Sequence, residues 1–287
     1  MSASSVYLSR EGKQGCLEAV VNPAYGAEVS SLKWNDRELL ARMPWQGADP
    51  QPLPDQAAWT AAWSGGWQLL FPNAGKRCFA DGRRHGFHGS VAQTSWRVVS
   101  STTTELSCEY RENAGFHLAR TYRLTQLGLV VHTTATNHDL RTRHCIAVEH
   151  LILGSTLLDA DAEIEAPGTV PMSAPFTARE KVARFGAVTG AQGSASFAQC
   201  CSKQPTLVQI RWDETSLGNM WFWQEVQTLT TQPWYGQARA LGLEPASVPS
   251  DAGLAAAMQR RDSTELMPGQ SWSWWVAIEV SAVPGDA

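Results

Sequence analysis

The chain has 287 residues, which is enough for one large β domain or two domains of ordinary size. Its formal net charge of -4 provides no basic face, so nucleic acid is excluded as an expected partner. Apolar residues make up 43% of the chain, which supports a hydrophobic core, and tryptophan is unusually common with 13 copies. Each indole combines a flat apolar face with one N–H donor, which suits both core packing and contact with sugar rings.

The cysteines and the N-terminal sequence indicate a reducing, cytoplasmic setting. No two cysteines have the C-x-x-C spacing, and the adjacent pair Cys200 and Cys201 suits a disulfide framework poorly. The N-terminal residues lack the apolar stretch of a signal peptide, and no apolar run is long enough to cross a membrane. We therefore expect a cytoplasmic protein that does not contact a membrane.

Period-two alternation of apolar and polar residues runs through most of the chain and predicts β-strands with one buried face. The expected strands comprise residues 16–21, 28–34, 95–100, 104–110, 116–124, 129–136, 145–153, 206–212 and 272–280. Helical signal is confined to residues 254–261, which Ser250 or Asp251 is expected to cap. Many short strands and so little helix predict an all-β fold, an antiparallel sandwich or barrel, in a single domain over residues 1–287.

Two segments do not follow this alternation. Residues 44–55 are rich in Pro and Gln and are expected to form a loop. Residues 159–200 are richer in Ala, Gly, Pro and Ser, and they are consistent with a long excursion from the sheet. No repeat of fixed period is visible, and no linker divides the chain, so we do not assign the excursion to a domain of its own.

The first candidate for chemistry is the carboxylate of Glu244. The chain turns apolar at Ala240, Leu241 and Leu243 before it reaches this residue, and Pro245 restricts the backbone that follows. A carboxylate held in a low-dielectric place has a raised pKa, which suits it to proton transfer. The alternative is a strand whose last residue meets water, as most glutamates do.

The second candidate is the polar pair Glu149 and His150, which interrupts the apolar run 145–153. Buried polar groups need partners, because an unpaired one is costly. Adjacent strand residues point to opposite faces, so only one of the two can enter a given pocket. We expect His150 to face the pocket with Glu149 in support; the alternative is a buried histidine whose hydrogen bond is purely structural.

Glycine-rich turns carry the next candidates. Asn73 lies in a Pro-Asn-Ala-Gly turn after an apolar run that begins at Trp67, so its amide faces either a ligand or the nearby backbone. His85 and His88 lie in a second turn, each followed by glycine, where they have little local cover. A metal site there needs a third ligand such as His150, and the spacing matches no known closed motif, so we expect no metal.

An aromatic stretch around Trp223 supplies a further candidate. Residues 219–227 combine tryptophan and phenylalanine with the polar Gln224 and Glu225. Such a strand either stacks against a sugar and bonds its hydroxyl groups, or packs in the core with polar edges. Arginines such as Arg84 and Arg239 are consistent with an anionic substrate, although exposed arginines are common.

Several short segments, taken together in chain order, resemble the galactose mutarotase-like (aldose 1-epimerase) superfamily. These are the Gly-Gly-x-x-x-x-Phe-Pro pattern within Gly65–Gly75, His85-Gly86-Phe87 followed by Trp96-Arg97-Val98, Glu149-His150 with Gly154, Leu243-Glu244-Pro245, and Pro268-Gly269-Gln270. Each motif is short, and their shared order along most of the chain carries the resemblance.

The resemblance implies a large antiparallel β-sandwich, sometimes called a supersandwich, that holds a sugar in a cleft of one sheet and needs no cofactor. It implies that Glu244 is the general base, that His150 is the general acid, and that His85 helps to hold the sugar. The other candidate substrate-binding residues are Asn73, Trp67, Arg84, Trp223 and Arg239.

The sequence departs from the family at one place. Some members continue His-Gly-Phe with Ala-Arg, whose arginine binds substrate, whereas this chain has His88-Gly89. That contact is therefore lost, or Arg83, Arg84 or Arg239 supplies it. Neither the usual sugar nor a phosphate on the sugar follows from the resemblance.

We therefore expect a cofactor-independent aldose 1-epimerase that interconverts the anomers of a small-molecule sugar by acid–base ring opening. A non-catalytic carbohydrate-binding or regulatory module of the same fold is the alternative, because a fold does not determine a function. A carbohydrate lyase or hydrolase is a third interpretation, although no long companion domain is visible. The geometric expectation is that Glu244 and His150 face one another across a cleft wide enough for one sugar ring.

Overall fold

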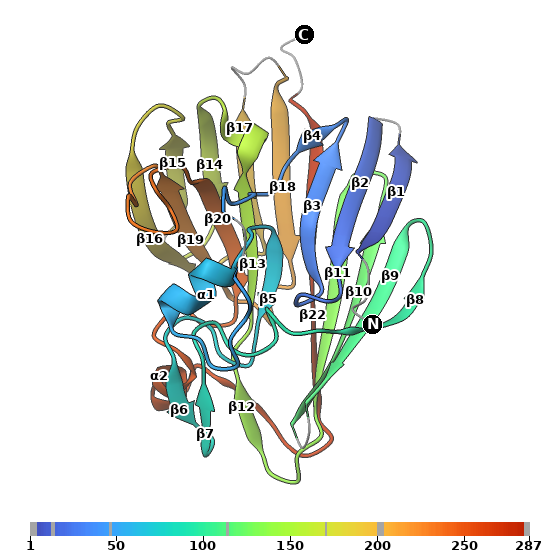
Figure 1. Cartoon of the computed structure of the whole chain (residues 1–287), viewed down its shortest axis with the longest axis vertical. Helices are drawn as coiled ribbons and strands as arrows, with labels where there is room; N and C mark the ends of the chain where they lie inside the picture. The colour runs from blue at the N-terminus through green and yellow to red at the C-terminus, as the bar shows by residue number, and fades with distance from the viewer. Residues whose placement is uncertain are drawn as a thin grey trace.

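The computed structural model of the protein describes residues 5–12, 15–45, 48–112, 115–169, 171–199 and 204–283. Two nine-stranded sheets pack face to face and contain most of these residues (Figure 1). Neighbouring strands within each sheet pair antiparallel. The all-β antiparallel sandwich that the alternation predicted is therefore confirmed.

The first sheet contains most of the residues that the sequence analysis singled out. In spatial order, its strands are β1 (Val6–Gly12), β2 (Gly15–Asn22), β3 (Glu28–Trp34), β5 (Trp67–Leu70), β13 (Val148–Gly154), β20 (Arg239–Ala246), β19 (Asn219–Val226) and β16 (Val182–Thr189), and the short β4 (Arg37–Glu38) pairs with β3. The predicted strand 145–153 is divided into β12 (Arg143–Cys145) and β13, because Ile146 donates to the Pro72 carbonyl outside the sheet.

The second sheet packs against the inner face of the first. Its strands, in spatial order, are β15 (Met172–Phe176), β14 (Ala162–Ala166), β17 (Ser194–Gln199), β18 (Thr206–Trp212), β22 (Ser271–Ala282), β11 (Gly128–Asn137), β10 (Phe116–Leu124), β9 (Glu105–Arg111) and β8 (Arg97–Ser101). Residues 159–200 are therefore not an excursion, since they contribute strands to both sheets. Cys200 and Cys201 lie outside the described residues.

Short helices and ribbons lie outside the two sheets (Figure 1). Helix α1 (Gln56–Ala62) follows the predicted loop 44–55, of which residues 46 and 47 are not described. Helix α2 (Leu254–Arg260) confirms the predicted helix, but its N-cap is Gly253, because the Ser250 hydroxyl accepts from Ala252 instead. The remaining elements are the ribbon of β6 (Cys78–Ala80) with β7 (Arg83–His85), the ribbon of β12 with β21 (Thr264–Leu266), and a 3-10 turn over Ser155–Leu158.

The core fills the space between the sheets, and each strand contributes alternate residues to it. On β22, Trp274, Val276 and Ile278 are almost fully buried, as the predicted alternation over residues 272–280 requires. On β10 the same holds for Leu118 and Tyr122. Burying these side chains supplies the main favourable term of folding, at about 25 cal/mol for each Å² removed from water.

A charged pair lies within this apolar core. Arg120 of β10 and Glu149 of β13 are both almost completely buried and form two hydrogen bonds of 3.0 Å. The carboxylate also accepts from the indole N–H groups of Trp67 and Trp274, each at 2.8 Å. The low-dielectric interior tolerates these charges because the hydrogen bonds compensate for lost hydration. Glu149 thereby ties β13 to both sheets.

Removing the arginine should destabilise the protein strongly. In the Arg120→Met variant Glu149 keeps a buried charge without its cation, and we expect a loss of about 3–5 kcal/mol in the free energy of unfolding. The additional change Glu149→Gln removes that charge and should recover part of the loss, as measured by urea denaturation.

The exposed pair Arg211–Glu279, with side chains 54% and 27% exposed, provides the control. Arg211→Met should cost less than about 1 kcal/mol, because water screens surface charges. Equal losses in Arg120→Met and Arg211→Met would contradict the structural importance assigned to the buried pair.

Candidate active site

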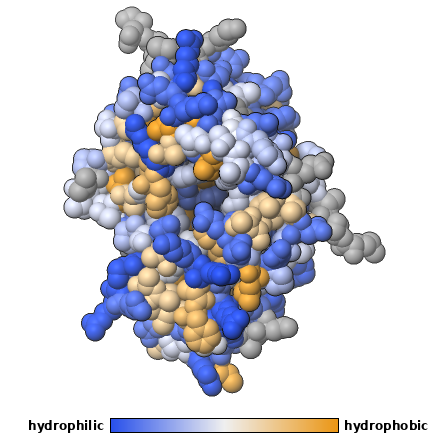
Figure 2. All heavy atoms as spheres, turned by 60° about the vertical axis from the view of Figure 1, so that its left-hand side comes forward, coloured by the Kyte–Doolittle hydropathy of each residue, from blue (hydrophilic) through white to orange (hydrophobic). Residues whose placement is uncertain are grey.

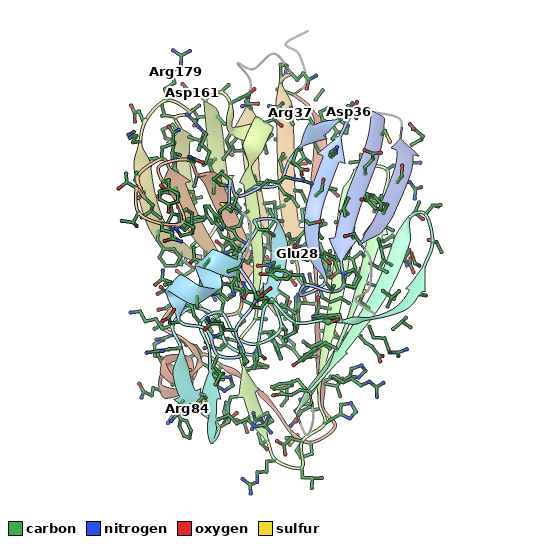
Figure 3. The ribbon with its side chains drawn as sticks, in the orientation of Figure 1. Glu28, Asp36, Arg37, Arg84, Asp161 and Arg179 are labelled. Atoms are coloured by element: carbon green, nitrogen blue, oxygen red, sulfur yellow. The ribbon has the colours of Figure 1, made fainter. Side chains whose placement is uncertain are left out.

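The outer face of the first sheet, which points away from the core, carries the candidate site. Gln68 of β5 and His150 of β13 are direct partners across the two strands. Glu244 of β20 comes next, with its Oε2 atom 4.0 Å from Nε2 of His150. Glu28, at the start of β3, accepts a hydrogen bond of 2.8 Å from the Gln68 amide. Polar side chains of neighbouring strands therefore form a row across the sheet, with Glu28 (labelled in Figure 3) at one end.

The Glu244–His150 pair is almost closed off from solvent, since the two side chains are only 3% and 8% exposed. Within the part of the chain that is described, Oε2 of Glu244 and Nδ1 of His150 are buried without a hydrogen-bond partner. A separation of 4.0 Å is too long for a hydrogen bond and leaves no room for an atom that bonds both groups from between them. The expected cleft, one sugar ring wide, is therefore not present, and a ligand has to contact both groups from one side.

Burial shifts the pKa values of both groups toward their uncharged forms. It raises the pKa of Glu244 well above its usual 4.5 and lowers the pKa of His150 from 6.5 to about 3. In this closed site burial therefore favours the protonated form of Glu244, and His150 is a neutral imidazole at neutral pH. The pair contains one transferable proton, and its titration belongs to the pair as a unit.

Gly242 makes room for the Glu244 carboxylate. A Cβ atom at Gly242 would lie 2.3 Å from Oε1 of Glu244 and 3.1 Å from Cδ1 of Ile152. Two residues apart on one strand, Gly242 and Glu244 share a face of the sheet, so their side-chain spaces overlap. Gly242 therefore leaves the space that the Glu244 carboxylate occupies in this position.

His88 is the second histidine beside the pair. Its ring centroid lies 5.4 Å from that of His150. The Gly75 N–H donates to Nδ1 of His88 at 3.0 Å, so Nε2 carries the proton of the neutral ring. Burial lowers the pKa of His88 well below its usual 6.5, which keeps the ring uncharged. The sequence analysis considered His88 as a turn residue or a metal ligand and noted that His88-Gly89 stands where some family members have Ala-Arg, but it did not place His88 beside His150.

Helix α1 covers the pair with two tryptophans. The ring centroids of Trp59 and Trp63 lie 5.6 Å and 5.3 Å from that of His150. Both indoles are buried, and neither Nε1–H group finds an acceptor among the described residues. Because a buried donor without an acceptor is costly, these groups indicate a place for a ligand or ordered water. The sequence analysis did not assign this helix; its signal was Asp55, a favoured N-cap, before an alanine-rich stretch.

Further tryptophans extend this aromatic wall. Trp223 of β19 lies 6.0 Å from Trp63, and Trp234 lies 6.3 Å from Trp63 and 4.9 Å from Trp45, measured between ring centroids. We call Trp45, Trp59, Trp63, Trp223 and Trp234 the tryptophan cluster. Figure 2 shows this side of the molecule, with a hollow near its middle and both hydrophilic and hydrophobic residues around it. Of the expected substrate-binding residues Trp67 and Trp223, the structure brings Trp223 near the Glu244–His150 pair.

Glu28 is a second buried carboxylate of the row. Its side chain is 2% exposed and accepts hydrogen bonds from Gln68 and Ser64. Burial raises the pKa of Glu28 from 4.5 to about 8, although these two hydrogen bonds lower it. The Gln68 amide nitrogen also donates to the Ala92 carbonyl, which leaves the Gln68 oxygen pointing away from Glu28. The sequence analysis did not single out Glu28 or Gln68.

Two residues expected to bind substrate are used within the protein. Trp67 faces the core and donates to Glu149, because alternation places its neighbour Gln68 on the outer face. Asn73 is completely buried, and its amide donates to two backbone carbonyls and accepts one backbone N–H at 2.7 Å. The structure therefore does not bring either side chain to the Glu244–His150 pair.

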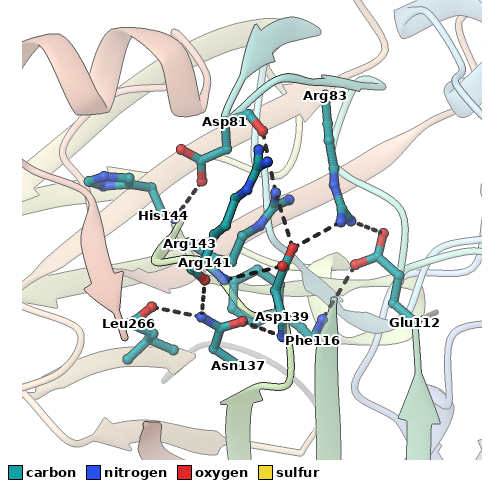
Figure 4. Close-up of polar contacts among 10 residues, drawn as sticks. All are labelled: Asp81, Arg83, Glu112, Phe116, Asn137, Asp139, Arg141, Arg143, His144 and Leu266. Carbon is teal, nitrogen blue, oxygen red and sulfur yellow. Dashed lines mark hydrogen bonds and ion pairs between the residues drawn. The ribbon is translucent and has the colours of Figure 1, made fainter. Parts of the chain in front are cut away.

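His85 lies in a different environment from the pair. It belongs to β7, and its Nε2 atom is buried without a partner among the residues that are described. Burial lowers the pKa of His85, and the charged side chains that act on it are Arg143, Glu112 and Asp81. These three residues lie in the polar cluster of Figure 4. His88, and not His85, is therefore the histidine of this segment that lies beside the pair, and the sugar contact of His85 stays a prediction.

The arginines considered as substrate contacts are engaged or directed elsewhere. Arg83 pairs with two carboxylates at 3.2 and 3.1 Å (Figure 4). Arg84 is exposed and points outward from the ribbon of β6 and β7 in Figure 3. Arg239 lies on the opposite face of β20 from Glu244 and donates to a backbone carbonyl. The structure does not bring these three side chains to the pair.

The described ranges also bear on metal ligands, membrane spans and disulfides. These ranges contain no group of three or more His, Cys, Asp or Glu side chains placed to hold a metal ion. They contain no helix that is both long enough and apolar enough to cross a membrane. The described cysteines, Cys16, Cys78, Cys108 and Cys145, are free thiols.

Several solved structures share this fold over almost the whole chain. The Slr1438 protein of Synechocystis sp. PCC 6803 superposes with a TM-score of 0.73 at 16% identity, covering 98% of each chain. A galactose mutarotase-like protein from Lactobacillus casei gives 0.67 at 17%, covering 96% of this chain and 100% of that one. The GalM/aldose epimerase homologue from C. elegans gives 0.67 at 15%, covering 98% and 100%.

These similarities show that the chain has the galactose mutarotase-like fold, as the short motifs implied. No protein-family model and no curated protein sequence matches the chain. At such low identity, the shared fold leaves the activity and the substrate to be argued from the site itself.

The buried Glu28 should make stability fall as pH rises. Its pKa is about 8 in the folded protein and 4.5 when exposed, so the folded state binds the proton more tightly. The stabilisation that comes from this tighter binding is fully present below pH 4.5 and is lost as the pH rises through 8. At roughly 1.4 kcal/mol per pH unit, the free energy of unfolding falls by up to about 5 kcal/mol. Glu28→Gln should therefore lose less stability than the parent protein between pH 5 and pH 9 in denaturant titrations.

The exposed Glu163 of β14 offers the matched control. Glu163→Gln should leave the difference between the two pH values unchanged. A Glu28→Gln variant with the same pH dependence as the parent protein would show that Glu28 is ionised in the folded state.

Proposed function

We propose that this protein is an aldose 1-epimerase-like enzyme, which interconverts the α and β anomers of a sugar by opening and reclosing its ring. The observation that carries the proposal is the buried Glu244–His150 pair, 4.0 Å apart and each with a polar atom that no described residue satisfies. The two groups come from different strands yet meet on one face, which suits a pair of proton-transfer groups. The tryptophan cluster beside them supplies flat faces for a sugar ring.

The reaction needs one proton to leave the anomeric hydroxyl and one to reach the ring oxygen. In our assignment the Glu244 carboxylate takes the proton from O1 while the His150 imidazolium gives its proton to O5. The C1–O5 bond breaks and the C1–O1 carbonyl forms. After rotation about C1–C2, O1 regains its proton from Glu244 and O5 returns its proton to His150, so the cycle closes without a cofactor.

The protonation state of the closed site fits this cycle through an internal transfer. Burial favours the protonated form of Glu244 and a neutral His150. The reactive form, a carboxylate beside an imidazolium, contains the same number of protons, and a hydroxyl group or water that contacts both groups from one side would carry the proton across the 4.0 Å separation. Hydrogen bonds from sugar hydroxyls to the Glu244 carboxylate would favour that form, because they stabilise its charge.

Non-catalytic sugar binding is the second candidate function. The observation in its favour is the same burial, which favours the uncharged form of Glu244, and that form cannot act as a base until a ligand changes its surroundings. In that case the tryptophan cluster would bind the sugar and no proton would be transferred. Sugar binding without anomer exchange above the buffer rate in the parent protein would identify this function.

Glu244→Gln tests the catalytic assignment with almost no change of shape. We expect anomer exchange, followed by polarimetry or by NMR of the two anomers, to fall by about 10²–10⁴-fold because the amide cannot accept the proton. Sugar affinity, measured by calorimetry, should change little. An unchanged exchange rate would remove Glu244 from the mechanism.

Gly242→Ala tests whether the position of the carboxylate matters. The added methyl group would lie 2.3 Å from Oε1 of Glu244, so the carboxylate has to move. Misplacement by about 1 Å can cost roughly 100-fold in rate, and we expect a loss of that order in anomer exchange.

Gly186→Ala on β16 is the matched control, since its new Cβ atom would meet nothing within 4 Å. It should keep the parent rate. Equal rates in the Gly242→Ala and Gly186→Ala variants would contradict the idea that Gly242 places the base.

A further inference from the structure

A cavity of about 230 Å³ lies on another side of Trp59 and does not include Glu244 or His150 among its lining residues. For comparison, a protein cavity of about 150 Å³ holds benzene, so this space suits a six-membered ring that carries hydroxyl groups. Trp59 and Pro54 supply apolar surface to its wall, and Tyr110 of β9 closes it from the second sheet. The cavity thus has the size and the flat surfaces of a site for a small ring.

The polar lining of the cavity is neutral. Ser90, Thr94 and Tyr110 contribute hydroxyl groups, Gln93 contributes an amide, and no lining residue carries a charge. The Gln93 amide nitrogen donates to the Trp59 carbonyl at 3.0 Å, which fixes the orientation of the amide. Its Oε1 atom is buried and has no hydrogen-bond partner in the described structure. The cavity therefore offers an acceptor to a ligand hydroxyl and no counter-charge to a phosphate or carboxylate.

Trp59 connects this cavity to the candidate active site. Its ring contacts His150 and His88, with centroids 5.6 Å and 4.5 Å away, and the same residue lines the cavity. Gly89, which follows His88 directly, lines it as well. Trp59 therefore borders both the cavity and the candidate active site.

We propose that the cavity beside Trp59 is a subsite for a second, uncharged sugar residue, so that the preferred substrate is a reducing oligosaccharide and not a single aldose. The proposal rests on the proposed function, in which the reducing-end ring meets Glu244 and His150. The next ring packs on Trp59 and Pro54, and its hydroxyl groups bond Gln93 and Tyr110. An uncharged residue is specified because the lining offers hydroxyl and amide groups only.

The test compares substrates of one and two rings on the intact protein. Anomer exchange is measured by NMR for D-glucose and for maltose, cellobiose and lactose, all of which present glucose at the reducing end. We expect kcat/KM to be at least tenfold higher for one or more of the disaccharides. Equal values for glucose and for all three disaccharides would overturn the subsite.

Two variants locate the effect in the cavity. Ser90→Leu fills the space and should lower kcat/KM for the preferred disaccharide to the value for glucose, while the glucose value stays within twofold. Tyr110→Phe removes one hydroxyl group and should lower only the disaccharide value, by severalfold. Tyr7→Phe, at a tyrosine that is 75% exposed, is the control and should change neither value. Equal losses for glucose and the disaccharide in Ser90→Leu would overturn the proposal.

Calorimetry separates this inference from the proposed function. If no sugar shows anomer exchange, the proposed enzyme activity fails, and disaccharide binding is then compared between the parent protein and Ser90→Leu. Binding that Ser90→Leu weakens at least tenfold would support the subsite in a non-catalytic protein. Binding that is absent, or that Ser90→Leu leaves unchanged, would overturn it.

Discussion

The buried pair of Arg120 and Glu149 is the interaction on which the arrangement of this protein depends. Two charges in an apolar core are tolerable only when each is paired and hydrogen-bonded, and here the carboxylate also accepts from two indoles on strands of both sheets. The strand that carries Glu149 is thereby held in one register. Because adjacent residues alternate, that register turns His150 to the outer face, where Glu244 arrives from β20.

The two faces of the first sheet consequently bury their polar side chains in different ways. On the inner face, Glu149 is buried as a charge because a cation and several donors compensate for its lost hydration. On the outer face, Glu244 and His150 are buried without such partners among the described residues, so their pKa values move toward the uncharged forms. A buried polar atom without a hydrogen-bond partner destabilises the fold. At a binding site, however, a ligand can supply the missing hydrogen bond.

Alternation and motif order predicted much of this arrangement. The strands 28–34 and 206–212 match β3 and β18 residue for residue, because period-two patterning reflects a single buried face. The same rule separated Glu149 from His150. It also puts Trp67 on the core side and Gln68 on the outer side, a consequence that the choice of Trp67 as a sugar contact overlooked. The positions of turn residues were harder to predict, since no periodicity indicates whether His85 or His88 lies beside the pair.

The sequence by itself determined the all-β class, most strand positions and the two residues, Glu244 and His150, that the fold brings together. These follow from local patterning and from short motifs in a shared order. The tertiary structure alone decided which histidine lies beside them, that α1 covers them with Trp59 and Trp63, and that Glu28 and Gln68 continue the row. The physical reason is that burial and proximity arise from contacts between residues far apart in the chain, which no local pattern encodes.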